Sequence, residues 1–184
     1  MEKKHGPWTI KSSERVYKDE FVEFWVDECV KPDGEPGRRA TLRMLPGVAV
    51  LPADEEGFVY MIRKFRYAVG KESVEVVQGA IDEGESAEEA ARRELKEELG
   101  IEAREVTDLG PVDAVTSQVF SPSRLFLARG LKFGEPDREG TEVLQPLKLK
   151  LQEAVRMVTD GEITQSTTCV LVLKASRLIE GNSQ

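Results

Sequence analysis

Histidine is almost absent from this chain of 184 residues, which contains only His5. Catalytic triads, cysteine–histidine pairs and many zinc sites need at least one histidine as a base or a ligand. His5 lies in an N-terminal stretch that we expect to be frayed. The composition therefore argues against Ser-His-Asp, Cys-His and histidine–metal chemistry.

Cysteine is also scarce, because Cys29 and Cys169 are the only two and lie far apart. They do not form the closely spaced pairs typical of zinc sites, and we expect them to stay reduced, as in cytosolic proteins. The first residues, MEKKHGPWT, lack the apolar core of a signal peptide, and no apolar run reaches membrane-spanning length. We therefore expect a cytoplasmic protein without a membrane partner.

Positive charge is in deficit, since 26 lysines and arginines face 34 aspartates and glutamates, and the net charge is −8. No basic patch stands out, which argues against nucleic acid as a partner. The length is sufficient for a well-buried core.

The most informative segment is GAIDEGESAEEAARRELKEELGI, residues 79–101. Ser86 and Glu89 have the spacing of a capping box, which predicts that a helix starts there. Gly100 has the position of a C-terminal cap, which predicts where the helix ends. Apolar residues at steps of four are expected to face the core: Ala87, Ala91, Leu95 and Leu99.

Three glutamates share one face of this predicted helix, because Glu94, Glu97 and Glu98 stand at i, i+3 and i+4. Their like charges destabilise a bare helix, whereas Mg²⁺ or Mn²⁺ would reverse that penalty. Arg93 can reach Glu97 one turn later and Glu85 in the preceding loop. The alternative is a solvated acidic helix face, but the flanking glycines and the loop glutamate favour a site for divalent metals and a diphosphate.

This segment resembles the Nudix box, the signature of enzymes that hydrolyse a nucleoside diphosphate linked to another group. The resemblance implies an α/β fold, namely an α/β/α sandwich with a mixed sheet in which the box forms a loop, a helix and a loop. It also implies that Arg93 and Glu85 brace the loop against the helix, and that the main-chain carbonyl of Gln78 is a metal ligand. The remaining metal-binding and catalytic residues implied by the resemblance are Glu94, Glu97 and Glu98.

Periodic patterns predict strands on both sides of the box. The predicted strands lie in residues 8–30 (two strands), 38–45, 46–53, 58–67, 72–79, 110–117 and 123–133. A helix is predicted for residues 149–162. Residues 164–180 are ambiguous, because β-branched residues favour a strand while the length, the Ser/Thr start and the basic end favour a helix. We predict a helix there.

The stretch MIRKFRYAVGKESVEVVQGAIDEGES also resembles the ADP-ribose pyrophosphatase-like branch of the Nudix family. This likeness implies metal-dependent hydrolysis of a nucleoside diphosphate sugar to a nucleoside monophosphate and a sugar phosphate. It implies that residues 1–45 form an N-terminal antiparallel β region that makes a homodimer, and that residues 46–184 form the hydrolase domain. Gln78 and Thr116 depart from the branch, which has alanine and proline at the matching positions. Other nucleotide sugars therefore stay open, including GDP-mannose and UDP- or ADP-hexoses.

The same likeness implies further contacts with the substrate. Arg66 matches an arginine that holds a phosphate. The branch takes its general base from a glutamate on a late loop, where Glu142 fits by register and Glu139 is the alternative. Phe24 and Trp25 lie where the branch offers an aromatic surface to the nucleobase. Since neighbours in a strand point to opposite faces, only one of these two can line a given site.

Two other functions remain open from the sequence. The first is a Nudix hydrolase of another substrate class, such as dinucleoside polyphosphates, capped RNA or coenzyme A. The second is a sensor that binds a nucleotide sugar without turnover. The N-terminal β region argues against the first, and the intact glutamates argue against the second.

Overall fold

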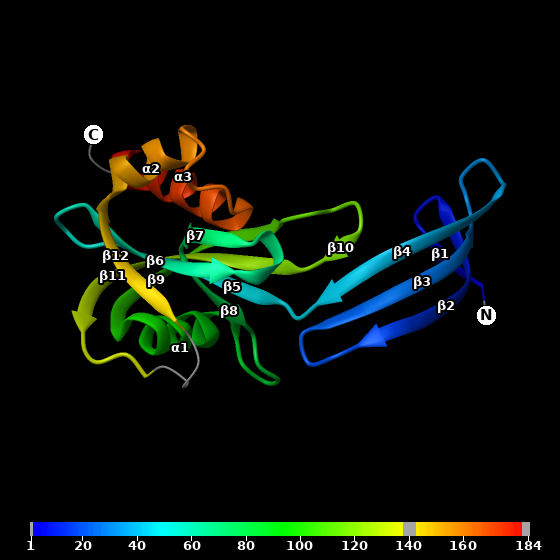
Figure 1. The fold of residues 1–184 in the computed structure, drawn as a ribbon, viewed down its shortest axis with the longest axis horizontal. Helices are drawn as coiled ribbons and strands as arrows, with labels where there is room; N and C mark the ends of the chain where they lie inside the picture. The colour runs from blue at the N-terminus through cyan, green and yellow to red at the C-terminus, as the bar shows by residue number, and fades with distance from the viewer. Residues whose placement is uncertain (1, 138–142, 182–184) are drawn as a thin grey trace. The chain divides into compact units, whose positions relative to one another are not determined.

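The computed structural model describes residues 2–137 and 143–181 (Figure 1). The chain forms two compact units. Unit 1 comprises residues 1–46 and 113–122, and unit 2 comprises residues 47–112 and 123–184. The segment 113–122 thus belongs with the N-terminal strands, although the sequence placed it in the hydrolase domain.

Unit 1 is a five-stranded sheet in the order β1-β2-β3-β4-β10. Strands β1 to β4 pair antiparallel, and β10 returns from far along the chain to pair parallel with β4. The antiparallel N-terminal β region is confirmed, whereas the expectation of a frayed terminus is wrong, because the first strand pairs with the second. The strands are β1 (Lys3–His5), β2 (Trp8–Lys18), β3 (Val22–Val30), β4 (Pro36–Met44) and β10 (Val119–Phe120).

Unit 2 contains a four-stranded sheet, β8-β5-β11-β9, and a three-stranded sheet, β12-β6-β7. The larger sheet is mixed, since β5 runs parallel to β11 and antiparallel to β8. The strands are β5 (Gly47–Pro52), β6 (Phe58–Arg66), β7 (Lys71–Glu75), β8 (Val77–Ala80), β9 (Ile101–Asp113), β11 (Pro122–Phe133) and β12 (Leu144–Lys150).

Helices cover both faces of these sheets in unit 2 (Figure 1). They are α1 (Ala87–Leu99), α2 (Leu151–Thr159) and α3 (Ser166–Gly181), with a short 3₁₀ turn, η1 (Tyr67–Val69). Successive residues of β5 point to opposite faces. Ala49 and Leu51 pack in the core under α2 and α3, while Val48 and Val50 pack in the core under α1. The predicted α/β/α sandwich is therefore confirmed.

Three predictions differ from the structure. Residues 72–79, predicted as one strand, form two strands, β7 and β8, which lie in different sheets. β9 begins at Ile101, directly after the box helix, and not at residue 110. Residues 144–150 form β12, although the sequence predicted no strand there and a helix from residue 149. β12 pairs antiparallel with β6, so its conformation depends on a distant partner. The last element is helix α3, as predicted. None of the described helices has the length and apolar character that crossing a membrane requires.

Candidate active site

Helix α1 has the two caps that its sequence predicts. The Ser86 hydroxyl accepts a hydrogen bond from the backbone N–H of Glu89, and the Glu89 carboxylate accepts one from the N–H of Ser86, at 3.2 and 2.9 Å. Gly100 ends the helix with φ +66°, in the left-handed region that favours glycine. A Cβ at Gly100 would also lie 2.4 Å from the carbonyl oxygen of Gly134. Both predicted boundaries of the helix are thus confirmed.

Arg93 joins the loop before α1 to the glutamates on the helix. Its guanidinium donates two hydrogen bonds to Glu85, each 3.0 Å long, and one of 2.9 Å to the carbonyl oxygen of Ala80. Nη1 donates to Glu94 at 2.7 Å and to Glu97 at 3.1 Å. Because bidentate arginine–carboxylate pairs are strong and directional, this contact holds the loop in one position relative to the helix.

The Glu94 carboxylate lies directly against the backbone of Gly79. A Cβ at Gly79 would stand 1.9 Å from Glu94 Oε1, so only glycine leaves room for the carboxylate. Burial raises the pKa of Glu94 to about 7, opposed by Arg93 and assisted by repulsion from Glu98 and Glu97. The crowding of negative charge that the sequence predicted is therefore present in the fold.

Glu98 is the most deeply buried of the three glutamates, with 3 % of its side chain exposed. Lys64 Nζ donates to Glu98 Oε1 at 2.9 Å from strand β6. Lys64 is not among the site residues predicted from the sequence. The alternation of side chains along β6 indicates the position of Lys64, because it puts Lys64 on the same face as Ile62 and Arg66. A lysine on the inner face of a half-buried strand needs an acidic partner.

Arg66 ends β6 and contacts Glu75, the last residue of β7. Arg66 Nε donates to Glu75 Oε1 at 3.0 Å, and Nη2 donates to Oε2. Glu75 is 1 % exposed, whereas 41 % of the Arg66 side chain reaches solvent. Burial raises the pKa of Glu75, but the hydrogen bonds and charge of Arg66 outweigh it and leave that pKa below its ordinary value. Gln78 Nε2 also donates to Glu75 Oε2, at 3.2 Å.

The donor set on α1 fits a divalent cation. Carboxylate oxygen is the ligand that Mg²⁺ and Mn²⁺ prefer, and three carboxylates share one helix face. Within residues 2–137 and 143–181, however, no three acidic, histidine or cysteine side chains already form a metal cage. Arg93 instead contacts Glu94 and Glu97, and Lys64 contacts Glu98. Each carboxylate has two oxygens with about four acceptor sites, so a bound cation can share these glutamates with Arg93 and Lys64.

The remaining predicted ligand and the two predicted bases are not part of α1. Gln78 lies in β8, opposite Ala49 of β5 and next to Gly79. Glu139 and Glu142 lie outside the described residues.

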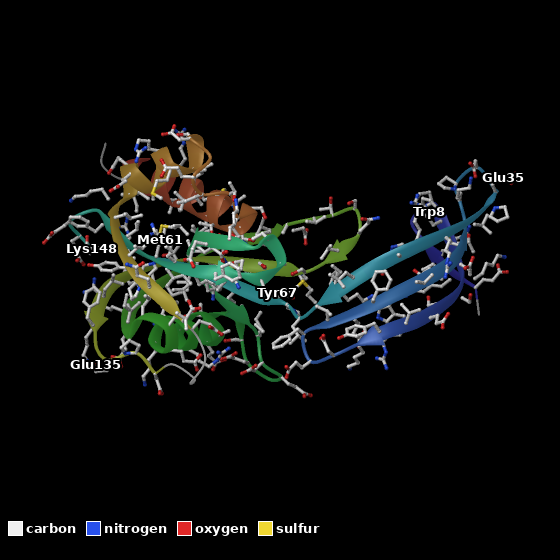
Figure 2. The ribbon with its side chains drawn as sticks, viewed as in Figure 1. Trp8, Glu35, Met61, Tyr67, Glu135 and Lys148 are labelled. Atoms are coloured by element: carbon white, nitrogen blue, oxygen red, sulfur yellow. The ribbon has the colours of Figure 1, made fainter. Side chains whose placement is uncertain are left out.

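The two predicted aromatic contacts lie in unit 1, on opposite faces of β3, as alternation predicts. Phe24 is 37 % exposed and, together with Trp8, lines a hollow of about 1090 Å³. Figure 2 labels Trp8 among the N-terminal strands of unit 1. Trp25 has the guanidinium groups of Arg15 and Arg43 over its ring, 5.7 and 4.8 Å from the ring centroid. Of the two, Phe24 has the more open ring.

The chain is similar to known proteins over most of its length. The profile of the NUDIX domain family matches residues 43–163. The ADP-ribose pyrophosphatase of Bacillus subtilis is 27 % identical over 165 residues, which cover 88 % of each chain. The ADP-ribose pyrophosphatase of Mycobacterium tuberculosis is 30 % identical over 178 residues, which cover 94 % of this chain and 85 % of that protein. The crystal structure of an ADP compounds hydrolase superposes with a TM-score of 0.81 at 23 % identity and covers 98 % of both chains. The chain therefore belongs to the Nudix family of pyrophosphohydrolases.

Proposed function

We propose that this enzyme hydrolyses the diphosphate bond of ADP-ribose or a related nucleoside diphosphate sugar, in the presence of Mg²⁺ or Mn²⁺. The products are a nucleoside monophosphate and a sugar phosphate. The observation that carries the proposal is similarity to two ADP-ribose pyrophosphatases over 88 % and 94 % of this chain. The similarity thus extends beyond the box to most of the chain, including part of the N-terminal strands.

Glu94, Glu97 and Glu98 are the residues that would hold the divalent ion, with the carbonyl of Gln78 as a further ligand. A bound ion supplies charge neutralisation for the diphosphate and lowers the pKa of the attacking water. Arg93 keeps the loop and the glutamates in register through its contacts with Glu85 and α1. Phosphoryl transfer depends chiefly on such alignment and on charge stabilisation.

The remaining roles fall to residues outside α1. Arg66, oriented by Glu75, binds a phosphate of the substrate. Glu142 takes the proton of the attacking water, with Glu139 as the alternative base. Phe24 stacks on the nucleobase, because its ring lines the hollow of unit 1, while the ring of Trp25 is already contacted by two arginines.

The assembly we propose is a two-fold homodimer formed through unit 1. Unit 1 contains one sheet and no helix among its described residues. Single sheets need a cover over their apolar face. Asp27 Oδ1 and Thr41 Oγ1 in this sheet are buried and have no hydrogen-bond partner among the described residues. A buried carboxylate without a donor is costly, so a second copy that supplies donors would stabilise this surface.

The test is a panel of nucleotide sugars incubated with the purified protein and Mg²⁺ or Mn²⁺. The panel contains ADP-ribose, ADP-glucose, GDP-mannose and UDP-glucose, and EDTA is the control. Release of nucleoside monophosphate and sugar phosphate, with one oxygen from labelled water, supports the proposal. Turnover of capped RNA or dinucleoside polyphosphates alone would contradict the substrate class. Binding of a nucleotide sugar without turnover would contradict an enzymatic role.

A further inference from the structure

The chain crosses from one sheet of unit 2 to the other at Val76. β7 ends at Glu75 and pairs with β6, whereas β8 begins at Val77 and pairs with β5. Val76 lies between the two ladders and is fully buried. Its N–H donates to the hydroxyl of Thr168, which is also fully buried, at 3.2 Å. The first turn of α3 therefore supplies the acceptor that the crossing needs.

A second connection between the β7–β8 crossing and the start of α3 runs through glutamine side chains. Gln165 Oε1 accepts a hydrogen bond from the N–H of Thr168 at 2.6 Å, and so caps the start of α3. Gln165 Nε2 donates to Gln78 Oε1 at 3.3 Å. Gln78 Nε2 then donates to Glu75 Oε2 at 3.2 Å. Glu75 in turn accepts from Arg66.

The orientation of both amides follows from the two ends of this chain of hydrogen bonds. A backbone N–H can only donate, so the group of Gln165 that faces Thr168 is its oxygen. An ionised carboxylate can only accept, so the group of Gln78 that faces Glu75 is its nitrogen. The nitrogen of Gln165 is then left to donate, and the oxygen of Gln78 is left to accept from it. Chains of hydrogen bonds with one consistent direction polarise and strengthen one another.

We propose that Gln78 and Gln165 are positioning residues that hold Glu75, and through it Arg66, in the orientation that binds a substrate phosphate. The inference rests on the proposed function, since it takes Arg66 as a phosphate ligand. The Glu75 carboxylate also accepts a hydrogen bond from the side chain of Ser73. Gln78 adds a donor to Oε2 of Glu75, and Gln165 ties the position of that donor to helix α3.

Gln165→Glu is the sharpest test, because it has nearly the same shape and still offers an oxygen to the N–H of Thr168. It removes the donor to Gln78 and adds one negative charge, so Gln78→Ala, which adds no charge, is needed beside it. Gln78→Ala removes the same link from the other side. Both variants are expected to raise KM for the diphosphate substrate about 3- to 10-fold, with kcat within about twofold, because the binding contribution of Arg66 is weakened. Their combination should be no worse than the larger single effect.

Thr168→Val is the matched structural control. It removes the hydroxyl that accepts from Val76 but leaves the N–H of Thr168 and the glutamine chain in place. It is expected to lower Tm without changing KM. If Thr168→Val raises KM as much as Gln165→Glu, or if both glutamine variants fold and keep the wild-type KM, the positioning role is overturned.

Arg66→Lys separates this inference from the proposed function. An increase in KM for Arg66→Lys, with no further increase when Gln165→Glu is added, supports both. An increase for Arg66→Lys alone, with silent glutamine variants, overturns only the positioning role. An unchanged KM in Arg66→Lys overturns the phosphate role and the inference that rests on it. The dissociation constant of ADP-ribose in EDTA, where turnover stops, gives the same comparison without catalysis.

Discussion

Replacing Glu98 by glutamine separates two contributions of one carboxylate, to folding and to metal binding. Only 3 % of the Glu98 side chain is exposed, against 13 % for Glu94 and 39 % for Glu97. Lys64, its partner at 2.9 Å, is 12 % exposed. The change keeps the size of the side chain and one oxygen for Lys64, and it removes one negative charge.

The expected loss of stability follows from the burial of this ion pair. Removing one partner of a buried pair costs roughly 3–5 kcal/mol when the other charge is left uncompensated. Glutamine retains an acceptor for Lys64 Nζ, so we expect about 1–3 kcal/mol for Glu98→Gln. The expected effect on kcat is larger, a loss of at least about 10²-fold, because a ligand of the charge-stabilising ion is lost.

Urea unfolding in EDTA measures the first effect, and initial rates with saturating Mg²⁺ measure the second. Lys64→Met removes the other partner of the ion pair. The double variant Lys64→Met/Glu98→Gln completes a double-mutant cycle with the two single variants. The double variant should be less destabilised than the sum of the singles, by about 1 kcal/mol or more, because the two side chains are in contact. Its kcat should stay as low as that of Glu98→Gln. A folded Glu98→Gln protein with nearly normal kcat would show that the acidic face of α1 is only a solvated surface.

Three further variants test other parts of the site. Gly79→Ala would place a Cβ 1.9 Å from Glu94 Oε1. We expect this overpacking to lower the free energy of unfolding in urea by about 1–3 kcal/mol and to lower kcat at least about 10-fold. Unchanged kinetics would contradict the role of this close contact. Glu142→Gln should lower kcat and leave the affinity for Mn²⁺ nearly intact, because a base need not bind the metal; a silent Glu142→Gln beside a damaging Glu139→Gln would assign the base to Glu139. Deleting residues 1–45 should give monomers or aggregates in sedimentation and weaken binding of the nucleotide sugar more than binding of Mn²⁺; a fully active full-length monomer at micromolar concentration would refute the dimer.

Local sequence was sufficient for the features of the site that lie within one helical segment. The hydrogen bonds of the Ser86–Glu89 capping box join residues three positions apart, and the backbone geometry of Gly100 depends on the last turn of α1. The common face of Glu94 and Glu98 follows from the helical period alone. The identity of the family could be predicted for the same reason, because the box is one continuous stretch of chain.

The ambiguous and missing elements show where local information ends. β12 carries residues that also suit a helix start, and its antiparallel pairing with β6 makes it a strand. The short N-terminal strand likewise exists because β2 lies beside it. β-structure depends on partners supplied by other parts of the chain, so its propensity is a weaker guide than that of a helix.

The sequence by itself determined the family, the box helix with its caps, and the set of glutamates that face one side. The contact of Arg93 with Glu97 also follows from the helical period, whereas only the tertiary structure decided that Lys64 meets Glu98 and how Arg66 is held. Lys64 reaches Glu98 from another strand, and Gln165 reaches Gln78 from the last helix. These partners are far apart in the chain, and no periodic pattern links them. Their contacts arise because two sheets and three helices pack together and bury polar groups that must then find one another.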